Sequence, residues 1–259
     1  MNVFKMTVLL TWMICIACRT SPPPAHPGMS AKVAVVKVEN LPLFDSARNR
    51  SIPVALYSPE SANIAPHPKL VIFSHGYGAN KGGSNQAYTY IAEHLVDKGY
   101  IVASIQHELP NDSLIPTTGI PQVVRRPFWE RGTDNILFVL NSLKKLHPNW
   151  DYTHLILIGH SNGGDMTALF AAKYPNLVDK IITLDNRRMP LPRLTHPKIY
   201  SLRSSDQPAD DGVIPTKEEQ QLFGITIIQL PNTIHNDMDD KASSTQRSEI
   251  NNYIDHFLQ

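Results

Sequence analysis

One short segment constrains this chain more than any other. Residues 154–164 read His-Leu-Ile-Leu-Ile-Gly-His-Ser-Asn-Gly-Gly, so an apolar run leads directly into the spacing Gly-x-Ser-x-Gly around Ser161. A helical pattern follows at residues 162–173. This order predicts a tight, strained turn that lifts the Ser161 hydroxyl above the end of a buried strand, at the positive end of the next helix. The segment therefore predicts a nucleophilic serine.

Apolar runs and helical patterns alternate along most of the chain, and this alternation predicts a mostly parallel central sheet with helices on both faces, an α/β fold. The first two strands, at residues 32–38 and 52–57, read as an antiparallel pair. A patternless loop over residues 109–128 is long enough to suggest a functional role. The other expected strands are 70–74, 101–105, 155–158, 181–184, 199–202 and 225–230, and the expected helices are 85–98, 133–146, 162–173, 216–222 and 244–258.

A serine that attacks a carbonyl needs hydrogen-bond donors for the oxyanion that forms. The backbone N–H of Asn162, directly after the serine, is the first expected donor. The loop Ser74-His-Gly-Tyr-Gly78 follows a predicted buried strand, and its glycines let the backbone approach a ligand closely. We therefore expect the backbone N–H of Tyr77 to be the second donor.

The general base is expected to be a histidine late in the chain, because a nucleophile of this type is followed in sequence by the acid and then by the histidine. His235 lies in a polar loop after the last predicted strand, whereas His256 lies on the predicted terminal helix. The sequence therefore predicts His235 as the base. We expect His75, His107 and His160 to support the site rather than to ionise in the reaction.

Several segments together resemble the platelet-activating-factor acetylhydrolases and their bacterial dienelactone-hydrolase-like relatives. They are residues 73–80, 99–107 and 159–164, and the likeness extends to 184–191 and 234–235. The resemblance implies the α/β-hydrolase fold and hydrolysis of carboxylic esters through an acyl-enzyme, with no metal and no cofactor. The long lipid-binding entry helix of the eukaryotic members is not evident in this sequence.

Two aspartates compete for the role of the acid that orients the histidine. Asp206 ends the seventh expected strand, where most α/β-hydrolases and the bacterial relatives carry it. Asp185 ends the sixth, which is its place in the acetylhydrolases. We favour Asp206 and keep Asp185 as the alternative. The aspartate that is not used is expected to pair with Arg187, Arg188 or Arg203.

The N-terminus reads as an export signal. Residues 6–17 are mostly apolar but fall short of the ~20 residues that span a bilayer. Residues 1–18 are expected to be a signal peptide, 19–30 a Pro-rich linker and 31–259 the catalytic domain. Ile16-Ala17-Cys18 resembles the end of a bacterial lipoprotein signal, with ordinary cleavage near Ala17 as the alternative. The protein is thus expected to be periplasmic, secreted or anchored to the envelope through a lipidated Cys18.

Charge and cysteine usage narrow the partners. The formal net charge is +1, which gives no indication of nucleic-acid binding, and both cysteines lie in the leader, so the domain has no disulfide or cysteine metal site. A small-molecule or lipid ester is the expected substrate. A thioesterase, an amidase or a polyester hydrolase would use the same residues, and an acyltransferase the same intermediate. A non-catalytic, envelope-tethered pseudo-hydrolase that only binds its ligand is the alternative from another class.

Overall fold

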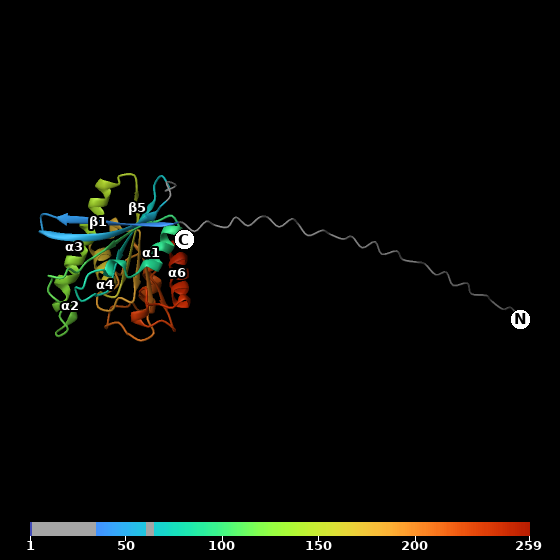
Figure 1. Ribbon diagram of the computed structural model, residues 1–259. Coiled ribbons are helices and arrows are strands. Elements are labelled where there is room, and N and C mark those ends of the chain that lie inside the picture. Colours follow the sequence, from blue (N-terminus) through green and yellow to red (C-terminus); the bar gives the residue numbers. More distant parts are fainter. Residues whose placement is uncertain (2–34, 61–64) are drawn as a thin grey trace. The chain divides into compact units, whose positions relative to one another are not determined.

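The computed structural model describes residue 1, residues 35–60 and residues 65–259 (Figure 1). The expected signal peptide at residues 1–18, with Cys15 and Cys18, and the expected linker at residues 19–30 lie outside the described residues. The fold below therefore concerns the expected catalytic domain.

An antiparallel pair opens the fold, as the sequence predicts. β1 (Val36–Asp45) pairs with β2 (Arg50–Pro59) along their whole length, from Val36 opposite Pro59 to Asp45 opposite Arg50. β1 runs further along the chain than the expected strand at residues 32–38. The Asp45 carboxylate accepts hydrogen bonds from the backbone N–H groups of residues 47 and 48 and so closes the turn between the strands.

The eight strands of the described residues form one sheet in the order β1-β2-β4-β3-β5-β6-β7-β8. Only the pairings of β2 are antiparallel, so β3 to β8 form the predicted parallel sheet. The carboxyl ends of these strands consequently meet at one edge, where the site lies. The remaining strands are β3 (Lys69–Ser74), β4 (Ile101–Ile105), β5 (Asp151–His160), β6 (Lys180–Leu184), β7 (Lys198–Arg203) and β8 (Thr226–Gln229).

The helices follow the expected order, with one early start. The helix predicted from residue 133 begins at residue 126, and a further short helix occupies part of the loop expected at 109–128. Pro127 lies in the first turn of the early helix, where its missing N–H costs no hydrogen bond. The helices are α1 (Thr89–Asp97), α2 (Pro121–Val124), α3 (Arg126–Leu146), α4 (Asn162–Lys173), α5 (Lys217–Phe223) and α6 (Ser244–Leu258).

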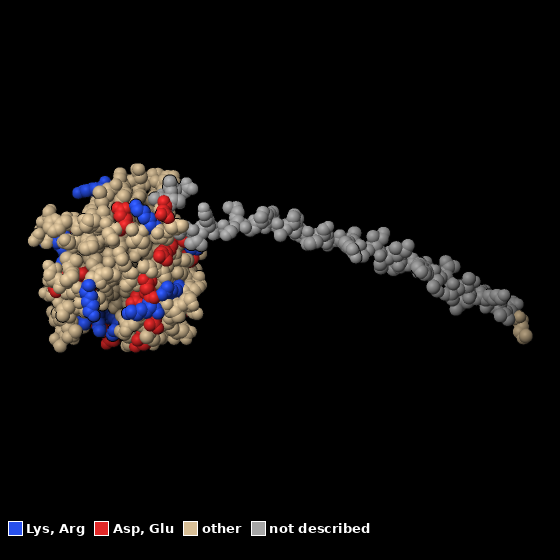
Figure 2. Space-filling model, viewed as in Figure 1, with Lys and Arg blue, Asp and Glu red and all other residues tan. Residues whose placement is uncertain are grey.

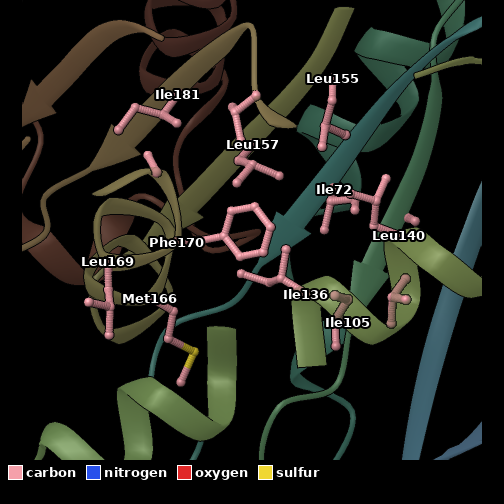
Figure 3. Packing of buried hydrophobic residues seen from close by; sticks show 14 of the residues in the cluster. Ile72, Ile105, Ile136, Leu140, Leu155, Leu157, Met166, Leu169, Phe170 and Ile181 are labelled. Atoms are coloured by element: carbon pink, nitrogen blue, oxygen red, sulfur yellow. The ribbon is translucent and has the colours of Figure 1, made fainter. Parts of the chain in front are cut away.

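Each face of the sheet packs against its own helices. Along β3, Leu70 and Ile72 belong to the apolar cluster under α3 and α4, whereas Val71 and Phe73 belong to the cluster under α1 and α6. This alternation follows from the two-residue repeat of a strand. Figure 3 shows the first cluster, in which Phe170 lies among side chains from β3, β5 and α3. The sheet is therefore a platform fixed from both sides.

The described surface shows mixed charge. On the face drawn in Figure 2, lysine and arginine side chains lie among aspartates and glutamates, as the near-neutral composition predicts. Among the described helices, none combines the length and the apolar character that a membrane crossing requires.

Candidate active site

Ser161 sits in the strained turn that the sequence predicts between β5 and α4. Its backbone has φ 52° and ψ −119°, a conformation that residues with side chains rarely adopt. The turn also needs its glycines. A methyl group at Gly159 would lie 2.4 Å from the carbonyl oxygen of Gly163, and one at Gly163 would lie 2.1 Å from that of Ser74. Only glycine fits either position.

His235 reaches the serine from the loop after β8. Its Nε2 lies 2.9 Å from Ser161 Oγ, so the hydroxyl can donate its proton to the imidazole. The imidazole is buried, whereas Ser161 is partly exposed and therefore open to a substrate. His235 begins a short 3₁₀ turn over residues 235–237. The structure thus brings together the two residues that the sequence predicts as nucleophile and base.

The acid beside the imidazole is Asp185, and the expectation that Asp206 occupies this place is wrong. Asp185 Oδ2 lies 2.5 Å from His235 Nδ1, and the side chain is fully buried. Asp206 is exposed and instead accepts a hydrogen bond of 2.7 Å from the backbone N–H of His235. The sheet explains the outcome, because His160 and Leu184 pair in register on β5 and β6. Ser161 and Asp185 therefore directly follow the last residues of two adjacent strands.

Donors surround the Asp185 carboxylate. Arg203 Nη2, at the end of β7, lies 2.9 Å from Oδ1, and Ser204 donates to it from its backbone N–H and to Oδ2 from its hydroxyl. Burial alone would raise the pKa of Asp185, but the hydrogen bonds from His235 and Ser204 and the charge of Arg203 outweigh it and hold the pKa below its usual value. Asp185 is thus kept ionised, and its backbone also has a positive φ of 55°.

The loop after β3 is held on both sides of Tyr77. The N–H of Gly76 donates to Tyr88 Oη at 3.1 Å, and the N–H of Gly78 donates to Glu108 Oε2 at 2.9 Å. His75 Nδ1 lies 2.6 Å from the carbonyl oxygen of Gly76. Because the peptide between Gly76 and Tyr77 is planar, a fixed carbonyl also fixes the direction of the Tyr77 N–H.

The two expected oxyanion donors belong to segments that adjoin the serine. A methyl group at Gly76 would lie 3.4 Å from Ser161 Cβ, so the loop that carries Tyr77 contacts the turn directly. Asn162 is the first residue of α4, where a backbone N–H has no acceptor within the helix. Within the described residues, neither the Tyr77 N–H nor the Asn162 N–H donates to a protein acceptor.

Three histidines near the site contribute through fixed hydrogen bonds. Burial lowers the pKa of His75 to about 4 and that of His160 to about 3, and it lowers the pKa of His107 well below its usual value. His75 Nε2 accepts the backbone N–H of His107, which leaves the proton on Nδ1 for the Gly76 carbonyl. His160 Nδ1 accepts from Tyr88 Oη at 2.7 Å, and its Nε2 donates to the carbonyl of His235 at 3.1 Å. The supporting role expected from the sequence agrees with these contacts.

Glu108 is a buried residue of the site that the sequence reasoning missed. One carboxylate oxygen accepts from Gly78, and the other accepts from the Asn162 side chain at 3.1 Å. The available signal was its position, directly after the apolar run of β4 and the dipeptide Gln106-His107. A charged side chain there must find buried partners.

A groove along α6, lined by residues such as Ser248 and Tyr253, contains none of the residues described above. Within residues 35–60 and 65–259, no group of three His, Cys, Asp or Glu side chains is arranged to hold a metal ion. The site is recognised by its hydrogen-bond geometry.

Comparison with known proteins agrees with this fold. Residues 69–209, more than half of the chain, match the family model of the α/β-hydrolase fold. No curated protein matches the sequence.

Similar solved structures share little sequence. One, from work on two fungal esterases from Rhizomucor miehei, has a TM-score of 0.64 at 15% identity, covering 88% of this chain and 83% of that one. A bacterial heroin esterase has a TM-score of 0.61 at 15% identity, covering 90% and 87%. The dienelactone-hydrolase-like promiscuous phosphotriesterase P91, from metagenomic libraries, has a TM-score of 0.61 at 16% identity, covering 86% and 98%.

Proposed function

The chain belongs to the α/β-hydrolase fold family, and we propose that it is a serine esterase that works through an acyl-enzyme. One observation carries the proposal. Ser161 Oγ, the two ring nitrogens of His235 and the Asp185 carboxylate form a continuous series of contacts of 2.9 Å and 2.5 Å. This is the arrangement by which a histidine activates a serine while a buried carboxylate fixes its tautomer.

Acylation begins when the Ser161 oxygen attacks the ester carbonyl and its proton passes to His235 Nε2. Asp185 stabilises the imidazolium that results, without taking a proton itself. The carbonyl oxygen becomes an oxyanion, which the backbone N–H groups of Tyr77 and Asn162 receive. When the carbon–oxygen bond to the leaving group breaks, the imidazolium returns the proton to the departing alcohol. The acyl group remains on Ser161.

Deacylation repeats these steps with water. His235 removes a proton from the water, which attacks the acyl carbonyl, and the same two N–H groups hold the second oxyanion. Collapse releases the carboxylic acid and restores the Ser161 hydroxyl. His235 Nε2 acts as the proton acceptor at the start of each half-reaction.

The substrate is proposed to be a carboxylic ester, either a small molecule or a lipid ester. The support is that similar structures include esterases, although their identity to this chain is low. A panel of matched ester, thioester and amide substrates separates an esterase from a thioesterase or an amidase. Addition of an alcohol acceptor tests for acyl transfer.

We further propose that the protein is exported and, through Cys18, attached to the bacterial envelope. The support is the composition of residues 1–18 alone. Fractionation of cells that express the full chain or its Cys18→Ser variant distinguishes the two forms of export. If the wild-type chain is found with the membranes and the Cys18→Ser variant is released, attachment through Cys18 is supported. If the wild type and the variant are distributed alike between the fractions, attachment is contradicted.

The decisive experiment for the activity is the Ser161→Ala variant, with Ser248→Ala on the exposed face of α6 as the matched control. With a short-chain p-nitrophenyl ester, we expect the first variant to lose ~10⁴-fold or more in kcat. The control should keep wild-type activity. A fluorophosphonate should label the wild type by displacement of fluoride from phosphorus, and Ser161→Ala should remain unlabelled. A folded wild type that neither turns over nor labels would favour a non-catalytic binding protein.

A further inference from the structure

Glu108 joins the two segments that carry the proposed oxyanion donors. Oε2 accepts the N–H of Gly78, which is the residue after Tyr77, and Oε1 accepts the side-chain amide of Asn162. The carboxyl group is buried at 1% exposure. A single carboxylate therefore spans the loop after β3 and the first residue of α4.

The orientation of the Asn162 amide is fixed from its other side. Trp129 Nε1, from α3, lies 2.9 Å from Asn162 Oδ1. An indole nitrogen can only donate, so Oδ1 must be the acceptor and Nδ2 must face Glu108. Asn162 cannot turn its amide without leaving the Trp129 donor unpaired. Glu108 is thus met by donors at both of its oxygens.

We propose that Glu108 is a positioning residue, and that its carboxylate, but not its protonated form, holds the Tyr77 and Asn162 N–H groups at the separation the oxyanion needs. This inference rests on the proposed function. It assigns Glu108 no contact with the substrate. Its effect passes through the backbone of residues 77 and 78 and through the Asn162 side chain.

The requirement for the ionised form follows from counting acceptors. Two donors face Glu108, and a carboxylate offers an acceptor to each. Protonation converts one oxygen into a hydroxyl whose hydrogen must be accommodated among those donors. A glutamine at this position has the same defect at every pH, because its NH₂ group would face one of the two donors. Glu108→Gln is therefore a permanent copy of the protonated state.

The surroundings of Glu108 place this change near neutral pH. Burial raises its pKa to about 7, against the hydrogen bonds from Gly78 and Asn162. Arg131 from α3 favours the charged form, and Asp112 from the following loop opposes it.

Other titratable groups near Glu108 change little over that range. Asp112 is itself paired with Arg50 from β2. Burial raises the pKa of Tyr88 well above its usual value, and His75 and His107, on the strand ends beside Glu108, stay neutral through their lowered pKa values. The pH response near neutrality is therefore assigned to Glu108 within this group.

The experiment compares the wild type with Glu108→Gln between about pH 5.5 and pH 8.5. Asp45→Asn, which changes a buried carboxylate at the end of β1, serves as the matched control. The kcat and KM for a p-nitrophenyl ester and the inhibition constant of phenylboronic acid, which forms a tetrahedral adduct, are measured at each pH. Circular dichroism verifies that each variant is folded.

We expect Glu108→Gln to lose ~10²-fold in kcat at the alkaline end, as when one oxyanion donor is removed, with KM changed by less than about threefold. Phenylboronic acid should bind more weakly by a similar factor. As pH falls, the wild type becomes protonated at Glu108, so the ratio of wild type to variant should approach one. Asp45→Asn should keep a constant ratio close to one.

Two results would overturn the positioning role of Glu108. One is an unchanged kcat in Glu108→Gln, and the other is a loss of kcat that stays constant across the pH range. A purely structural role gives the second result. If Glu108→Gln does not fold, Asn162→Ala takes its place in the ratio, because it removes one of the two donors to the same carboxylate and leaves His235 unchanged. The same two results then overturn the proposal. Activity that does not depend on Ser161 would instead contradict the proposed function, and with it the positioning role of Glu108 in that reaction.

Discussion

Two buried carboxylates contact residues next to Ser161 in the site, and their surroundings differ. Asp185 contacts an imidazole, an arginine and a serine, and its pKa lies below the usual value. Glu108 contacts a backbone N–H and a neutral amide, and its pKa is raised to about 7. Both are almost completely removed from solvent.

The difference shows what keeps a buried carboxylate charged. Burial disfavours the charged form of each, and neutral donors offset only part of that cost. At Asp185 the nearby cation Arg203 and the additional donors outweigh the effect of burial on the pKa. At Glu108 the donors from Gly78 and Asn162 do not outweigh it. The charged form of Asp185 is therefore favoured, whereas at Glu108 burial dominates and brings the pKa close to neutrality.

The largest expected effect on kcat comes from substitution of Asp185. We expect Asp185→Asn to lower kcat by ~10⁴-fold, because an amide holds the imidazole in the wrong tautomer. Asp206→Asn should change kcat by less than about threefold, because its amide oxygen can still accept the His235 N–H. Steady-state kinetics with a p-nitrophenyl ester measures both. The opposite order of effects would return the role of the acid to Asp206.

Unfolding measurements can sharpen the contrast at Glu108. Its pKa in the folded protein lies above the usual 4.5, at about 7, so its contribution to stability is fully present below pH 4.5 and is lost as pH rises through 7. Relative to Glu108→Gln, the wild type should lose up to ~3 kcal/mol of unfolding free energy across this interval. Urea unfolding at a series of pH values tests this. A difference in stability that does not vary with pH would mean that Glu108 ionises normally.

The smallest expected effect lies at Tyr88, which connects the two sides. Tyr88→Phe removes the acceptor of the Gly76 N–H and the donor to His160. We expect a loss of about tenfold in kcat and ~1–3 kcal/mol of stability, because buried polar groups lose their partners. Tyr152→Phe is the control, because the Tyr152 hydroxyl donates only to backbone carbonyl groups at the end of α3. It should lose similar stability and keep kcat.

The sequence predicted those parts of the fold and site that depend on local pattern. The turn at Ser161 follows from two glycines between a buried strand and a helix, and the parallel sheet follows from the alternation of strands and helices. His235 could be predicted as the base because it is the histidine directly after the last strand. The start of α3 was missed because Pro127 and Gly132 are residues that helix interiors disfavour, although a proline is compatible with the first turn.

The choice of the acid could not be made in this way. Asp185 and Asp206 both follow strands, and both contact His235, one at the ring and the other at the backbone N–H. Which atom each meets depends on how two loops turn in space. Glu108 was missed for a related reason, because its partners Gly78 and Asn162 lie far from it in sequence. The expectation that the unused aspartate pairs with one of three arginines is wrong, because Arg203 pairs with Asp185, the residue at the imidazole.

The register of β5 and β6 has a mechanical consequence. Ser161 and Asp185 follow paired residues on neighbouring strands, and the N–H of Ser161 bonds to the carbonyl of Leu184 at 2.8 Å. The distance between nucleophile and acid is thus set by the spacing of the strands, while the base alone is delivered by a loop. A displacement of the segment around His235 would disconnect the proton path and leave the sheet untouched. The proposed proton path could therefore be interrupted while the sheet stays folded.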